Sequence, residues 1–247
     1  MDKLIYTAMT GASHVLQQQA AVSQNLANTN TPGFRAAINT FRAVPLVGEG
    51  LPTRTFVVDS SSGSDFSQGA MQPTGRDLDV AVQGSGWITL QMADGSEAYT
   101  RNGGMQIAPD GTLQTHSGLP VAGDNGPITI PPNTQITIGT DGTISTVPSG
   151  TKPVPATVVG RIKLANPPEA QMVRGDDGLF RTKDGQAAEA DTKVALAPGN
   201  IESSNVNTVG AMVDMISLAR SYDLQMKMLQ NADSNAKTAE SLLNINA

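Results

Sequence analysis

The chain has 247 residues with a net charge of −6, 38% hydrophobic and 4% aromatic residues, and no cysteine. This length allows one large domain or two small ones, and the absence of cysteine excludes disulfides, thiolate catalysis and Cys-ligated metals. Because the acidic balance comes without any run of Lys or Arg, neither nucleic acid nor an anionic membrane surface is expected as a partner.

The N-terminus lacks the basic region and apolar core that together define a cleavable secretory signal. No apolar run reaches the length needed to span a bilayer. We therefore expect neither a cleaved signal peptide nor insertion into a membrane.

Residues 1–30 predict an amphipathic helix. Its apolar residues recur at alternating spacings of three and four, which keeps one stripe of the helix facing a partner. The members of this stripe that we assign to a packing interface are Ile5, Ala8, Ala12, Val15, Val22 and Leu26. Pro32 disfavours helical geometry for Thr31, and residues 31–34 are typical of a turn, so the helix is expected to end there.

Residues 31–76 predict an extended connector. Short apolar stretches, such as residues 41–44 and 55–58, alternate with Pro, Gly and a run of Ser at residues 60–62. This pattern allows a β-hairpin within the connector but does not predict an independent domain.

Residues 77–200 predict a β-rich domain. Alternating apolar and polar residues begin at Leu78, and Asp-Gly or Asn-Gly pairs such as Asp94-Gly95, Asn102-Gly103 and Asp110-Gly111 punctuate the short runs that follow. Such pairs between strands are a strong hairpin signal. We therefore expect an antiparallel barrel or sandwich-like domain with one hydrophobic interior.

Residues 201–247 predict a second long amphipathic helix. Ser204, Asn205 and Asn207 are candidate helix caps. Apolar residues then recur every three or four positions up to the C-terminus. The members of this series that we assign to packing between subunits are Met212, Ile216, Ala219, Tyr222, Met226, Leu229, Ala236 and Leu243.

The expected fold class is α+β: long N- and C-terminal helices forming a coiled-coil layer, a central antiparallel β barrel or sandwich-like domain, and an extended connector. Most amphipathic stripes simply face the core of their own domain. Both helices here, however, are long and lie at the ends of a β region whose hairpins can form a core unaided. We therefore interpret the two stripes as surfaces that pack against neighbouring subunits.

Catalytic chemistry has little support in the sequence. The two histidines, His14 and His116, are far apart, and neither has a carboxylate or second His at metal-ligand spacing. Asp77 and Asp79 are typical of the solvated face of a strand, and Asp177-Gly178 is typical of a turn and not of a calcium loop. We assign no catalytic, cofactor or metal site and expect a protein that is not an enzyme and has no small-molecule substrate.

Three motifs resemble those of a known family. The first covers Gln24 to Arg35 and the last covers Ile201 to Val206 together with residues 212–222; these resemble the N- and C-terminal signatures of bacterial flagellar rod and hook proteins. Between them, residues 78–103 resemble the β domain of the rod members. The motif residues are Asn25, Leu26, Ala27, Asn28, Thr31, Pro32, Gly33, Phe34, Ser204, Asn205 and Val206.

This resemblance implies a structural subunit that is exported unfolded through the flagellar type III apparatus and assembled in the periplasmic space. Its terminal helices would form a hollow helical tube with copies of the chain and with other rod proteins, and the rod would transmit motor torque. Residues 41–45 and 51–55 favour a proximal rod protein, with a distal rod protein as the alternative. A β-module that binds a ligand on a helical stalk remains a further alternative. A wall hydrolase is disfavoured, because no acid/base pair is convincing.

Overall fold

The computed structural model describes residues 2–45, 55–150 and 155–244. The chain divides into two compact units, which we call the helical unit and the β unit. The helical unit comprises Met1–Asn28, Ala37–Asp65 and Val206–Ala247, and the β unit comprises Thr29–Ala36 and Phe66–Asn205.

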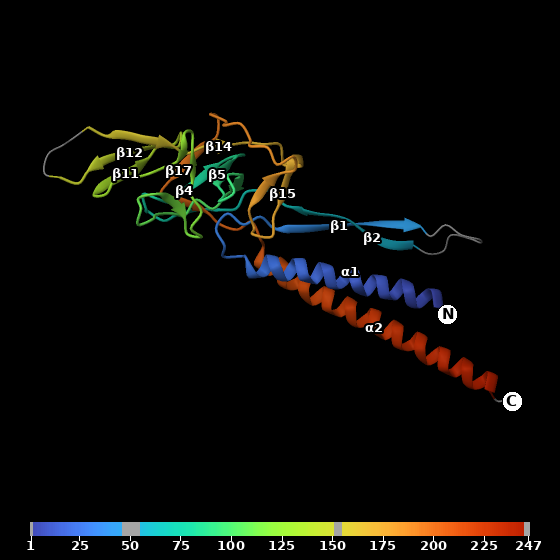
Figure 1. Ribbon diagram of the computed structural model, residues 1–247. Coiled ribbons are helices and arrows are strands. Elements are labelled where there is room, and N and C mark those ends of the chain that lie inside the picture. Colours follow the sequence, from blue (N-terminus) through green and yellow to red (C-terminus); the bar gives the residue numbers. More distant parts are fainter. Residues whose placement is uncertain (1, 46–54, 151–154, 245–247) are drawn as a thin grey trace. The chain divides into compact units, whose positions relative to one another are not determined.

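The helical unit consists of two antiparallel helices and a β-hairpin (Figure 1). Helix α1 (Asp2–Ala27) runs beside α2 (Thr208–Asn244), and a Cβ added at Gly11 would lie 3.2 Å from the amide nitrogen of Gln225. Strands β1 (Ala37–Pro45) and β2 (Thr55–Ser64) pair antiparallel, with a register shift after Thr40. Helix α2 begins with a side-chain cap, because Asn207 Oδ1 accepts the Gly210 N–H at 3.0 Å.

The β unit is built from short strands. They are β3 (Met71–Pro73), β4 (Val80–Gln83), β5 (Trp87–Gln91), β6 (Glu97–Thr100), β7 (Met105–Ile107), β8 (Leu113–Thr115), β9 (Ala122–Gly123), β10 (Gly126–Pro127), β11 (Thr134–Ile138), β12 (Thr143–Pro148), β13 (Thr157–Arg161), β14 (Leu164–Ala165), β15 (Met172–Arg174), β16 (Phe180–Thr182), β17 (Ala195–Pro198) and β18 (Asn200–Glu202).

These strands form several small sheets. The largest has five strands in the order β14-β5-β6-β16-β15, and β11-β12-β13 form a second sheet. Strand β17 pairs with β4, β18 with β3, β7 with β8, and β10 with β9. The pairing of β18 with β3 is important for the site, because it joins the last strand of the β unit to the first.

Two hydrophobic clusters fill the β unit. The larger one contains residues from β4, β5, β11 and β12, including Val80, Leu90 and Ile144, all three fully buried. The smaller one is aromatic and contains Trp87, Tyr99, Ala165, Met172 and Phe180. Residues on both faces of β4 and β5 are buried, so these strands are covered on two sides.

The predicted fold class is therefore wrong in two respects. Helix α1 has 26 residues and α2 has 37, or about 39 and 55 Å. The N-terminal helix is thus the shorter of the two, and a coiled-coil layer of two long helices is not supported. Among the described residues the strands close no barrel, because they are divided among small sheets and pack around two clusters instead of one interior.

The hairpin predicted at Asn102-Gly103 is also wrong. The strands on either side, β6 and β7, belong to different sheets. A Cβ at Gly103 would lie 1.6 Å from the carbonyl oxygen of Val80, so glycine is needed there for close approach of two backbones and not for a hairpin turn. Separately, no helix in the described part of the chain is long and apolar enough to cross a membrane.

Candidate functional site

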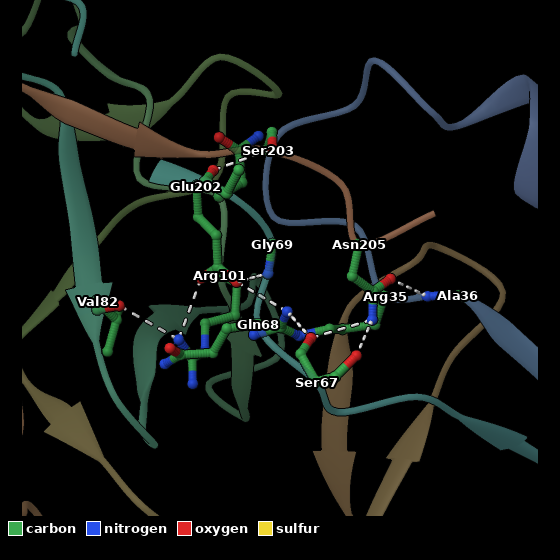
Figure 2. A network of polar contacts seen from close by, with 12 residues as sticks. Arg35, Ala36, Ser67, Gln68, Gly69, Val82, Arg101, Glu202, Ser203 and Asn205 are labelled. Atoms are coloured by element: carbon green, nitrogen blue, oxygen red, sulfur yellow. Dashed lines mark hydrogen bonds and ion pairs between the residues drawn. The ribbon is translucent and has the colours of Figure 1, made fainter. Parts of the chain in front are cut away.

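A buried ionic network lies in the β unit and is centred on Glu202 (Figure 2). Its Oε1 lies 2.7 Å from Arg35 Nη1 and its Oε2 lies 3.1 Å from Arg101 Nη1. The three side chains are 1%, 1% and 4% exposed for Glu202, Arg35 and Arg101. Glu202 Oε1 also accepts the Gly69 N–H at 2.9 Å, so both carboxylate oxygens are engaged.

Each member is placed by a different part of the chain. Arg35 directly follows the turn that ends the N-terminal signature, and the Gly33 N–H in that turn donates to the Glu202 carbonyl at 2.8 Å. Glu202 is the last residue of β18. Arg101 follows β6, and its Nη2 donates to the Gly84 carbonyl at 2.7 Å.

Gly33 shows how tightly these segments meet. Its φ of +68° is a conformation that residues with a Cβ rarely adopt. A Cβ at this position would also lie 2.3 Å from the carbonyl carbon of Arg101. The turn therefore requires glycine for two independent reasons.

Asn205 extends the network along the C-terminal signature. Its Oδ1 accepts the Ala36 N–H at 2.7 Å, and its Nδ2 donates to the Ser67 carbonyl at 3.0 Å. Its own N–H donates to the Phe34 carbonyl at 3.3 Å. One side chain thus holds together three segments that are far apart in the sequence.

The two arginines outnumber the single carboxylate in this network. Burial lowers the pKa of Arg101, while the nearby Glu202 carboxylate acts in the opposite direction. Arginine stays charged in proteins, so both guanidinium groups keep their positive charge in this network. The network suits a fixed, non-covalent connection between chain segments.

The network lies where the chain enters and leaves the β unit. The chain passes between the two units after Asn28, Ala36, Asp65 and Asn205. On the β-unit side, residues 33–36, 67–69 and 202–205 are hydrogen-bonded to one another. The segments that continue into the helical unit are thus tied together inside the β unit.

On α1, the predicted interface positions face their own unit. Ala8 and Ala12 are 3% and 7% exposed. The other four positions on α1 are partly buried: Ile5, Val15, Val22 and Leu26.

On α2 the predicted positions divide between two faces. Tyr222, Met226 and Leu229 are partly buried. The structure does not describe the side chain of Leu243. The remaining predicted positions are exposed: Met212, Ile216, Ala219 and Ala236. The covered face of the first turns instead carries Met215 and Leu218, which the sequence analysis did not assign to the series.

The exposed apolar residues in the first turns of α2 form one continuous surface, which we call the α2 strip. It consists of Val209, Met212, Val213 and Ile216, with exposed fractions of 72%, 50%, 60% and 56%. Their spacing of three and four places them on one side of the helix. Met215 and Leu218 lie on the opposite side, so the first turns of α2 are apolar on both faces.

Beside the strip, the helical unit has a groove of about 400 Å³ between α1, β1 and α2. Asn25 of the N-terminal signature helps to form it, because its Oδ1 accepts the Ala37 N–H at 2.7 Å and its Nδ2 donates to the Ala37 carbonyl at 2.9 Å. These two bonds attach the start of β1 to α1. Further lining residues are Val22, Ile38, Asn39, Asp214 and Leu218.

The remaining signature residues have varied surroundings. Phe34 is 6% exposed, and the Arg174 guanidinium lies 4.2 Å from the centre of its ring. Asn28, which directly follows α1, donates from its side chain to the Gln24 carbonyl at 2.9 Å. Exposed positions are Ala27 and Thr31, and partly buried positions are Leu26, Pro32, Gly33, Ser204 and Val206.

Sequence reasoning missed all three charged members of the network. Arg35, Arg101 and Glu202 each lie inside a recognised motif, yet charged residues are almost never fully buried unless paired. Their pairing spans more than 100 residues and leaves no local spacing signal. In the described part of the chain no three His, Asp or Glu residues could hold a metal ion.

The chain matches three family models along its length. Residues 5–35 match the flagella basal body rod protein model, residues 81–146 the flagellar hook protein FlgE/F/G D1 domain, and residues 197–242 the flagellar basal body rod FlgEFG protein C-terminal model. Together with full-length relatives of high identity, these matches show that the chain belongs to the family of flagellar basal-body rod proteins.

Within this family the chain is similar over its whole length to FlgF proteins. The flagellar basal-body rod protein FlgF of Escherichia coli (strain K12) is 48% identical over 99% of this chain and 100% of the relative. FlgF of Salmonella typhimurium is 47% identical with the same coverage. A FlgG protein, from Buchnera aphidicola subsp. Schizaphis graminum, is 29% identical over 93% of this chain and 95% of the relative.

Proposed function

We propose that this chain is a structural subunit of the bacterial flagellar basal-body rod, and that its helical unit packs against neighbouring subunits. The observation that carries the packing role is the α2 strip, where four large apolar side chains remain exposed although the opposite face of α2 is covered. Contiguous exposed apolar surface on a soluble protein marks an interaction site. Rod-family membership gives this surface its natural partners, which are other rod subunits.

The finer assignment follows the relatives. The higher identity to FlgF than to the FlgG relative supports a proximal rather than a distal rod subunit. The chain would assemble with copies of itself and with other rod proteins into a hollow helical tube in the periplasmic space. It would arrive there through the flagellar type III export apparatus without a cleaved signal peptide.

The buried network supports a role in transmitting torque. A rod subunit must pass force between its units through the chain segments that join them. In the β unit, ion pairs and hydrogen bonds of Glu202, Arg35 and Asn205 join these segments to one another. A force that pulls on one segment must therefore also break its bonds to the other segments.

A charged substitution in the strip tests the proposal. Ile216→Asp should abolish swimming and rod formation in cells that carry it in place of the native chain, because a buried unpaired carboxylate is costly at a packed interface. Gln230→Asp, an exposed position on the same helix outside the strip, makes the same charge change and is the control.

Circular dichroism of the purified variants should show unchanged secondary structure, since Ile216 is 56% exposed in the free chain. Normal swimming of the Ile216→Asp strain would refute the packing role of the strip.

A further inference from the structure

We infer that Met212 is a modification site, at which oxidation to methionine sulfoxide prevents assembly of the chain. The inference rests on the proposed packing role of the α2 strip and adds to it a means of regulation. The oxidant is a hydroperoxide, a class of compound that transfers one oxygen atom to a thioether sulfur.

The first observation is that Met212 is accessible. The described part of the chain has four exposed methionines, with exposed fractions between 41% and 54%: Met9, Met71, Met212 and Met228. In the hydrophobic clusters of the β unit, Met105 and Met172 are 0% and 6% exposed. An oxidant must reach the sulfur atom to react with it. The exposed methionines should therefore react directly, and the buried ones only when the β unit opens.

The second observation is the position of Met212 within the strip. Val209 precedes it by three positions and Ile216 follows it by four, so the three side chains lie on one side of α2. The other members of the strip are Val or Ile, which hydroperoxides do not oxidise. Met215 lies on the opposite side of the helix and is partly buried. One reaction at one sulfur atom therefore changes the middle of the exposed apolar surface.

The reaction needs no reagent other than the peroxide. The Met212 sulfur attacks one oxygen of hydrogen peroxide, so that the S–O bond forms as the O–O bond breaks. The sulfur loses two electrons and the leaving oxygen gains them. The leaving oxygen also takes the hydrogen of the transferred oxygen and departs as water. The product is a polar, neutral sulfoxide in place of an apolar thioether, and methionine sulfoxide reductases can reverse the change.

The sulfoxide should impair assembly without impairing the fold. Met212 is 50% exposed in the free chain, so water can hydrate the new oxygen. When a neighbouring subunit covers the strip, the oxygen loses this water, and the side chains of Val209, Val213 and Ile216 offer it no hydrogen-bond donor. Burial of an unpaired polar group is unfavourable. The covered state is therefore disfavoured, and the unassembled chain is the form that reacts.

Peptide mass spectrometry of the purified chain in dilute hydrogen peroxide tests the accessibility of the site. Met212 should gain oxygen at a rate similar to that of Met71, and about ten times faster than Met105, which reacts only through opening of the β unit. Circular dichroism should show unchanged helix content after oxidation. Reaction of Met212 no faster than that of Met105 would overturn the site.

Oxidation-resistant variants test the effect on assembly in cells. Met212→Leu removes the sulfur but keeps an apolar side chain of similar size, and Met71→Leu makes the same change at an exposed methionine of the β unit. Native and variant strains receive a pulse of hydrogen peroxide while rods assemble, and newly formed basal bodies are counted. The Met212→Leu strain should retain about five times more assembly than the native and Met71→Leu strains, because it cannot place a sulfoxide in the strip.

A polar substitution gives a second readout that needs no peroxide. Met212→Gln places a polar side chain of similar length in the strip and should reduce swimming several-fold, whereas Met71→Gln should not. Normal swimming of the Met212→Gln strain would show that the strip tolerates a polar group at this point, and would overturn the inference.

The outcomes also separate this inference from the proposed function. If native and Met212→Leu strains are equally sensitive to peroxide while Ile216→Asp still blocks assembly, Met212 is not the regulated site and the proposed function stands. Normal assembly of the Ile216→Asp strain would instead overturn the proposed function.

Discussion

Replacing Glu202 with glutamine tests the buried network directly. Glu202→Gln keeps the size of the side chain but removes the negative charge that faces Arg35 at 2.7 Å and Arg101 at 3.1 Å. Both guanidinium groups then remain buried without a counter-charge, and a glutamine NH2 group would oppose one of them. Removing one partner of a buried ion pair costs about 3–5 kcal/mol.

That loss is large compared with the stability of a typical domain, about 5–15 kcal/mol. For a chain of this size, each kcal/mol lowers the midpoint of thermal unfolding by about 2–4 °C. We therefore expect Glu202→Gln to lower the midpoint of the β unit by roughly 10 °C, measured by calorimetry or by circular dichroism of the purified chain.

The control is Asp177→Asn, which removes an exposed ion pair with Arg181 whose side chains are 36% and 39% exposed for Arg181 and Asp177. Exposed pairs contribute less than about 1 kcal/mol. The double variant Arg101→Met/Glu202→Gln should lose less free energy of unfolding than the sum of the losses in the two single variants, because it removes one of the uncompensated charges. If Glu202→Gln lowers the stability no more than Asp177→Asn does, the network does not stabilise the β unit.

Two further predictions concern single residues of the β unit. Gly33→Ala should destabilise it much more than Gly185→Ala: the two glycines have φ of +68° and +69°, but a Cβ at Gly185 meets nothing within 4 Å, whereas at Gly33 it meets the Arg101 backbone. Equal decreases in the free energy of unfolding, measured in urea, would show that the turn has room to relax. Burial raises the pKa of Tyr99 to about 12, with Glu97 adding to the effect. The stability that comes from its neutral phenol should be complete below about pH 10 and be lost as the pH rises towards about 12; a difference titration of native chain against Tyr99→Phe by phenolate absorbance that gives a midpoint near 10 would contradict this.

Local features of the fold could be predicted from the sequence because their causes are local. The Asp-Gly turns are confirmed at Gly95, Gly111 and Gly142, which all have positive φ. The preceding aspartates accept backbone N–H groups two residues ahead, as Asp94 does from Ser96 at 2.9 Å. Hydrogen bonds from the Ser96 hydroxyl and, secondly, from its backbone N–H lower the pKa of Asp94. Each of these turns is determined by four or five consecutive residues.

The sheet arrangement could not be predicted in the same way. An Asn-Gly pair indicates a turn, but at Asn102-Gly103 glycine is needed because another backbone lies against it. Alternation at Asp79 predicted a solvated face, yet Asp79 is 3% exposed, forms a β-bridge with Gly104 and accepts the Gly199 N–H at its carbonyl oxygen. Both errors arise from neighbours that are distant in sequence and cover a surface that the strand alone would leave open.

Helix α2 shows a different limit. Its first turns carry apolar residues on two opposite sides, with Met212 and Ile216 on one side and Met215 and Leu218 on the other. Periodicity shows that both stripes exist but does not decide which one packs against α1. That choice depends on the shape of the partner helix.

The ionic network explains why the two terminal signatures belong together. Gly33 donates to the Glu202 carbonyl, Phe34 accepts from the Asn205 N–H, and Ala36 donates to the Asn205 side chain. These contacts occur within one chain and within the β unit, so the signature residues nearest the β unit serve folding directly. The surface that we propose for assembly lies elsewhere, on the first turns of α2. A substitution at Gly33 should therefore impair folding before it impairs assembly, whereas one at Ile216 should impair assembly alone.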